Sequence, residues 1–154
     1  MKKPVSITVG VAAALVFCYF AIDGVSRQPI FLTYRFNRIY SEGVWGRNAA
    51  GNGTSGSGST LEITREYRTY LQEFLKTHRV TSVVDAGCGD WSFSSTIDWA
   101  DASYLGVDIA SDVIEADRTK HEKGNITFRV GDITEELPAA DLLHLALGLG
   151  HEIL

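Results

Sequence analysis

A short apolar run at residues 80–85 passes directly into a glycine-rich turn, and this junction constrains the fold more than any other part of the chain. The run, VTSVVD, is rich in β-branched residues, which is typical of a buried strand. Gly87 and Gly89 follow within VVDAGCGDW. Glycine permits a sharp turn and a close approach of the backbone to a ligand, because it has no Cβ. The junction therefore predicts a strand that ends at a ligand-binding turn.

Further apolar runs predict strands at residues 104–109, 126–130 and 141–147. Helical periodicity predicts a helix from the capping-box spacing Ser59-x-x-Glu62 to about residue 78, and a second helix that Ser111 caps and Gly124 ends. Strands that alternate with helices at this spacing predict an α/β fold. We expect a mainly parallel sheet with helices on both faces.

The acidic residue ahead of the glycines indicates which ligand the turn accepts. Open α/β sheets bind ligands at the carboxyl ends of their strands. Asp85 would repel the pyrophosphate of a dinucleotide, and Ser92 stands where a dinucleotide fingerprint has its third glycine. A ligand with an ammonium group and a positive sulfur would instead benefit from negative charge. Asp108 follows the glycines at a spacing that suits ribose hydroxyls. This spacing supports an adenosine ligand but does not distinguish a dinucleotide from a sulfonium ligand.

The third strand ends in Gly131-Asp132-Ile133. The Asp132 carboxylate can accept a hydrogen bond from an adenine amino group, and Ile133 can cover the base. Each carboxylate of the three strand ends also has a simpler explanation as an ordinary turn or helix-leading residue. Cys88, between the two glycines, is expected to be a small buried side chain rather than a nucleophile, because the sequence places no base beside it.

The motifs together resemble those of class I S-adenosylmethionine (SAM)-dependent methyltransferases. VVDAGCGDW, YLGVDI, ITFRVGDI and ADLL occur in the family's order and spacing over residues 80–143, and VWG with SGSGSTLEITREYRTYLQEFL resembles the lead-in of a bacterial-type subgroup. The resemblance implies a Rossmann-like domain that uses SAM as cofactor for methyl transfer. Trp91 replaces the small third residue of the family's D/E-x-G-x-G-x-G pattern. The cofactor-binding residues that the resemblance implies are Asp85, Gly87 and Gly89 for the SAM loop, Asp108 at the ribose, and Asp132 and Ile133 at the adenine. Ile109, next to Asp108, is a further expected cofactor-binding residue.

The resemblance covers only part of the family's domain. Family members continue past the fourth strand with further strands that supply most of the acceptor site, whereas this sequence ends at Leu154 in LALGLGHEIL. We expect a C-terminally truncated, incomplete sheet of about four strands and no methyltransferase activity of the chain alone. The acceptor and the catalytic residues are unknown; His144 is a candidate base, although a lone strand histidine is more often structural. A non-catalytic adenosine-ligand-binding or relic domain and an NAD-dependent oxidoreductase remain as alternatives.

A hydrophobic segment lies at the N-terminus. Residues 5–22 carry no charge and follow Lys2 and Lys3, and about 18 apolar residues suffice to cross a bilayer. Residues 1–26 are therefore predicted to be a transmembrane anchor of a single-pass membrane protein. A cleaved signal and secretion are the alternative, because Gly24-Val25-Ser26 offers a small-residue cleavage site. Basic residues flank the segment on both sides, so the positive-inside rule gives no firm orientation.

Residues 27–60 are predicted to be a juxtamembrane segment and linker. RQPIFLTYRFNRIY suits a membrane interface or an amphipathic lead-in helix, and GVWGRNAAGNGTSGSGST is typical of a flexible linker. The partial SAM-binding domain then covers residues 61–154. A net charge of -5 with scattered basic residues makes nucleic acid an unexpected partner. The two cysteines, Cys18 and Cys88, cannot form a multi-thiolate metal site, so no metal is expected.

Overall fold

The computed structural model describes Gly24 and residues 28–145. The chain divides into two compact units, Met1–Leu32 and Thr33–Leu154, and the second contains the sheet. Two short 3-10 turns, η1 (Ser57–Ser59) and η2 (Ser94–Thr96), accompany the helices and strands. The helices and strands are, in chain order, α2 (Pro29–Glu42), α3 (Arg65–His78), β1 (Ser82–Ala86), β2 (Ser103–Asp108), α4 (Ser111–His121), β3 (Ile126–Val130) and β4 (Leu142–His144).

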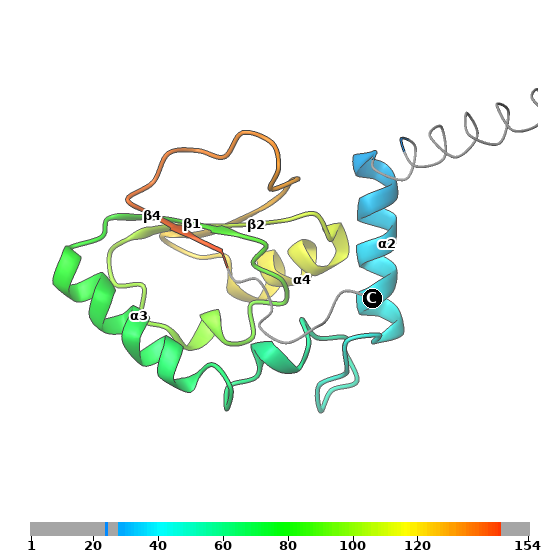
Figure 1. Ribbon diagram of the computed structural model, residues 1–154, viewed down its shortest axis with the longest axis horizontal. Helices are drawn as coiled ribbons and strands as arrows, with labels where there is room; N and C mark the ends of the chain where they lie inside the picture. Colours follow the sequence, from blue (N-terminus) through cyan, green and yellow to red (C-terminus); the bar gives the residue numbers. More distant parts are fainter. Residues whose placement is uncertain (1–23, 25–27, 146–154) are drawn as a thin grey trace, which may run out of the picture. The chain divides into compact units, whose positions relative to one another are not determined.

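The sheet has the strand order β3-β2-β1-β4, and every neighbouring pair is parallel (Figure 1). This order is the beginning of the doubly wound order 3-2-1-4-5-6, so the predicted parallel α/β architecture is confirmed. The direction of strand addition reverses at β1, which has β2 on one side and β4 on the other. Ligands of open α/β sheets bind outside the carboxyl ends of the strands at such a reversal. The fold therefore makes the end of β1 the candidate site.

Both helices that pack on the sheet cover the same face. Side chains alternate between the two faces of a strand, so the paired residues Val83 and Tyr104 share one face. Both belong to a buried cluster that also contains Leu75 of α3 and Ile114 of α4. The opposite face is crossed by the coil of residues 131–141 (Figure 1). The expectation of helices on both faces is thus not met in the described part of the chain, because the connection from β3 to β4 is coil there.

Helix α3 begins at Arg65 rather than near Ser59, and the capping-box spacing is not used. Residues 60–64 form a turn in which the amide and the hydroxyl of Thr64 both donate to the carbonyl of Thr60, at 3.0 and 2.7 Å. Ser59 instead lies in the 3-10 turn η1, where its amide donates to the carbonyl of Gly56 at 3.1 Å. The helix ends as expected at His78, where Arg79 adopts the left-handed conformation.

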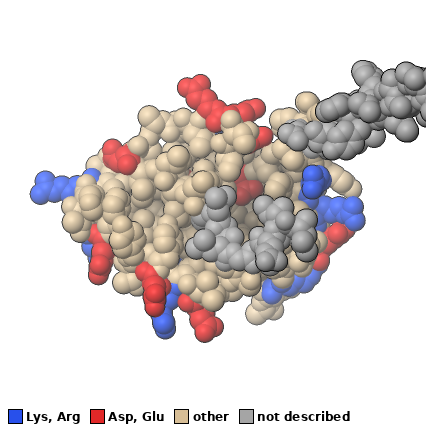
Figure 2. All heavy atoms as spheres, in the orientation of Figure 1, with Lys and Arg blue, Asp and Glu red and all other residues tan. Residues whose placement is uncertain are grey.

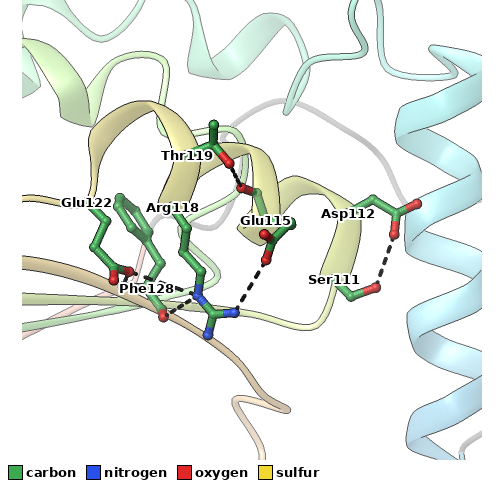
Figure 3. A network of polar contacts seen from close by, with 7 residues as sticks. All are labelled: Ser111, Asp112, Glu115, Arg118, Thr119, Glu122 and Phe128. Atoms are coloured by element: carbon green, nitrogen blue, oxygen red, sulfur yellow. Dashed lines mark hydrogen bonds and ion pairs between the residues drawn. The ribbon is translucent and has the colours of Figure 1, made fainter.

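Helix α4 starts at Ser111 itself, so Ala110 rather than Ser111 is the N-cap and no side chain caps the helix, and it ends at His121, before Gly124. Its side chains reach the edge strand β3 (Figure 3). The guanidinium of Arg118 donates to the carbonyl of Phe128 at 3.0 Å, and the carboxylate of Glu122 accepts from the amide of the same residue at 3.2 Å. These hydrogen bonds attach the C-terminal end of α4 to the edge of the sheet that β3 forms.

No helix among the described residues is both long and apolar enough to cross a bilayer. The predicted anchor at residues 5–22 lies outside the described residues and stays a prediction, as does the end of the predicted fourth strand beyond residue 145. On the face drawn in Figure 2, most of the visible charged side chains lie around the rim, where acidic and basic groups are interspersed.

Candidate functional site

The glycine turn after β1 is fastened to the end of β2. Gly87 and Gly89 have φ values of 80° and 58°, in the left-handed region that favours glycine. The amide of Gly87 donates to the carbonyl of Val107 at 2.7 Å, and the amide of Gly89 donates to Oδ2 of Asp108 at 3.0 Å. The structure thus brings together two predicted loop residues and the carboxylate predicted for the ribose.

The two glycines have different surroundings. A Cβ added at Gly87 would have no atom of another residue within 4 Å, so this side of the turn is open. A Cβ added at Gly89 would lie 2.2 Å from Oγ of Ser55 and 3.0 Å from the hydroxyl of Tyr40. Gly87 therefore leaves space for a ligand, whereas Gly89 allows close packing against another segment of the protein.

Trp91 occupies the position of the third glycine in the family pattern, and its backbone has the left-handed conformation that glycine usually adopts. Its φ is 50°, a conformation that is strained for a bulky residue. The indole is buried, donates from Nε1 to the hydroxyl of Tyr104 at 2.7 Å, and packs edge-on against Phe128 at 5.2 Å between ring centroids. The departure from the pattern thus lies in the side chain, and buried packing stabilises the left-handed turn.

Asp108 is held at the end of β2 by backbone amides. Its Oδ2 accepts from Gly89, and its Oδ1 accepts from Ala110 at 2.9 Å. Burial raises the pKa of this carboxyl above its usual value, while the hydrogen bonds from the amides act in the opposite direction. Each carboxylate oxygen has more than one acceptor position. The fixed carboxylate can therefore accept additional hydrogen bonds from a ligand's hydroxyl groups.

Asp85 joins a separate, buried network. It lies on the same strand face as Val83, which packs in the core, and it is 1% exposed. The hydroxyl of Tyr104 donates to its Oδ2, and its Oδ1 lies 2.9 Å from Nδ1 of His144. The ring of His144 is stacked on that of Tyr67, with 5.7 Å between centroids. The structure thus connects Asp85 to Tyr104 and His144, a set that the sequence did not indicate.

The predicted adenine residues follow β3, the strand next to β2. Because parallel neighbours end at one edge of a sheet, they lie on the same side as Asp108. Oδ1 of Asp132 accepts from the amide and the hydroxyl of Thr134, at 2.8 and 2.7 Å, and these hydrogen bonds lower the pKa of Asp132. Ile109 and Ile133 are half-buried. The turn thus holds Asp132 in its charged form.

Two buried groups near the turn are kept uncharged by their surroundings. Cys88 is a free thiol that is buried, as expected, and burial together with the charge of Asp85 raises its pKa. Asp117 of α4 is 3% exposed, and its Oδ2 has no hydrogen-bond partner among the described residues. Burial, and then the charge of Asp90, raise the pKa of Asp117 to about 8.

In the described part of the chain, no group of acidic, histidine and cysteine side chains could hold a metal ion.

No protein-family model and no curated protein sequence matches the chain. Among solved structures, human N-acetylserotonin methyltransferase in complex with SAM is similar at 19% identity and a TM-score of 0.36, over 56% of this chain and 29% of that one. Magnesium protoporphyrin IX methyltransferase from Synechocystis PCC 6803 with bound S-adenosylhomocysteine (SAH) is similar at 20% identity and a TM-score of 0.44, over 82% and 57%. This chain therefore spans only part of the length of each neighbour.

Proposed function

We propose that this chain is the SAM-binding part of a class I methyltransferase that acts on an unidentified acceptor. One observation carries the proposal: the Asp108 carboxylate is fixed beside a glycine turn that is open at Gly87, at the reversal point of a parallel sheet. A side chain at Gly87 would fill the space that a ligand needs there. The open turn and the adjacent carboxylate fit an adenosine-containing cofactor.

In the proposed complex, Asp108 accepts hydrogen bonds from the ribose hydroxyls while its own position is maintained by the amides of Gly89 and Ala110. Ile109 and Ile133 flank the base, and Asp132 accepts from its amino group. Bound SAM would supply the methyl group of its sulfonium to a nucleophilic atom of the acceptor by in-line displacement, and its sulfur would become the neutral thioether of SAH. The protein's contribution to such a reaction is mainly the alignment of the reacting groups.

The connection that follows the turn disfavours a nicotinamide dinucleotide. A dinucleotide fold places the N-terminus of an α-helix at the glycine turn, where its amides bind the pyrophosphate. Here the turn leads through Asp90 and Trp91 into the 3-10 turn Ser94–Thr96 and then into β2, and the described residues contain no α-helix between β1 and β2. The structure therefore offers no helix end to the pyrophosphate at this position.

Calorimetry on the full chain, with SAH, SAM and NAD as separate ligands, tests the proposal. We expect binding of SAH and SAM but not of NAD. Asp108→Ala should weaken SAH binding by about 1.5–3 kcal/mol, the scale of hydrogen bonds to a charged group. Asp101→Ala is the matched control, because Asp101 is an exposed turn residue ahead of β2. Unchanged SAH affinity in a folded Asp108→Ala variant would remove this residue from the site, and preferential NAD binding would overturn the proposed class.

A further inference from the structure

The Gly/Ser-rich segment of residues 43–60 follows a defined path, although its composition predicts a flexible linker. The guanidinium of Arg47 donates to two backbone carbonyls, each at 2.7 Å. A Cβ added at Gly53 would lie 1.9 Å from the carbonyl oxygen of Tyr40, so the segment passes directly over the end of α2. Glycine here permits a close contact between two backbone segments, and the segment is part of the folded domain.

The hydroxyl of Ser55 connects this segment to the glycine turn. It donates to Oδ1 of Asp90 at 2.8 Å and accepts from the amide of Asp90 at 2.9 Å. The hydroxyl of Tyr40 lies 3.0 Å away. Because Ser55 has one proton and gives it to the carboxylate, Tyr40 is the donor in this third contact. Burial raises the pKa of Tyr40, so its phenol keeps the proton that it donates.

A second contact lies at the start of α4, just after Asp108. The side-chain amide of Asn37 donates to the hydroxyl of Ser111 at 2.8 Å and accepts from the amide of Asp112 at 3.2 Å. Apolar contacts surround this pair. They involve Phe36, Tyr40 and Trp45 on one side and Ala110 and Val113 on the other. Helix α2 and the segment of residues 43–60, together called the lead-in, thus contact both elements of the candidate site, which are the turn after β1 and the helix after β2.

We propose that Ser55 is a positioning residue of the cofactor turn, through which the segment of residues 43–60 and the turn of residues 87–91 order one another. This inference rests on the proposed function as far as the ligand is concerned, but the contact itself does not require a ligand. Ser55→Ala removes the acceptor of the Asp90 amide and a donor to its carboxylate. Ser92 still donates to the other carboxylate oxygen at 2.6 Å, so Asp90 stays in place while the attachment to the lead-in is lost.

Hydrogen exchange without ligand tests the contact directly. In Ser55→Ala, peptides covering residues 43–56 and 87–92 should both exchange faster than in the wild-type chain, because each segment loses its partner. Ser55→Thr should restore slow exchange, since it keeps the hydroxyl. Ser57→Ala is the matched control, because Ser57 is an exposed serine of the same segment. Unchanged exchange of residues 87–92 in Ser55→Ala would overturn the proposal.

Calorimetry with SAH then measures the consequence for binding. We expect the dissociation constant of Ser55→Ala to rise about tenfold, the effect of losing one or two hydrogen bonds that organise the turn, with recovery in Ser55→Thr. Faster exchange with an unchanged dissociation constant would overturn the positioning role. If the wild-type chain binds neither SAH nor SAM, the proposed function fails, whereas the exchange experiment still decides whether Ser55 orders the turn.

Discussion

Alanine substitutions at the two glycines of the turn should have different consequences. Gly87 has a φ of 80° and open space at its Cβ position, so Gly87→Ala should cost only the strain of a left-handed residue, about 1–2 kcal/mol of folding stability. At Gly89 the same strain applies, and the new Cβ would lie 2.2 Å from Oγ of Ser55. Displacing that hydroxyl breaks hydrogen bonds worth about 1 kcal/mol each, so Gly89→Ala should cost about 3–5 kcal/mol.

SAH affinity should fall more in Gly87→Ala than in Gly89→Ala, the reverse of the order for stability. The methyl group of Gly87→Ala occupies the open side of the turn, so this variant should lose most of its SAH affinity while it remains folded. Denaturant unfolding measures the stability of both variants, and calorimetry measures the affinity of each variant that is folded. A Gly87→Ala protein that binds SAH like the wild type would show that the ligand does not approach the turn there. Equal losses of stability in the two variants would contradict the assigned close contact at Gly89.

Further predictions concern buried charge, the core network and the N-terminus. The pKa of Asp117 is about 8 in the folded chain and about 3.9 in the unfolded chain, so the contribution of this carboxyl to the free energy of unfolding falls as the pH rises from 4 to 8. Asp117→Asn should flatten that pH dependence and add about 2–4 kcal/mol to the free energy of unfolding at pH 8. A variant whose stability follows the wild-type pH profile would refute this. Tyr104→Phe leaves a carboxylate oxygen of Asp85 without its donor and should lower the free energy of unfolding by about 1–3 kcal/mol, measured with urea. The full chain should sediment with membranes, and a chain that begins near Ser41 should not; recovery of a soluble form that begins near Arg27 would instead indicate a cleaved signal.

The strands of the sheet could be predicted because their signals are local. Residues 126–130 match β3 at both ends, and the starts and ends of β1 and β2 differ from the prediction by no more than two residues. The turn residues Gly87, Gly89 and Asp108 could be predicted for the same reason, since their spacing along neighbouring strands places them at one edge.

Contacts between distant segments could not be predicted in the same way. Composition makes residues 43–60 look like a linker, because it does not show that a glycine such as Gly53 permits close packing instead of flexibility. The place of Asp85 in the motif predicts contact with the ligand. The two-residue period of a strand puts it on the face of Val83, toward the core, and its partners Tyr104 and His144 come from two other strands.

The hydrogen bonds between α4 and β3 determine where this sheet can grow. β3 forms one edge, and the outward amide and carbonyl of Phe128 are already occupied by Glu122 and Arg118 (Figure 3). An incoming strand would have to displace both side chains before it could pair there. Among the described strands β4 forms the other edge, where Leu143 is 60% exposed. A further strand, from this chain or from another molecule, should therefore add beside β4.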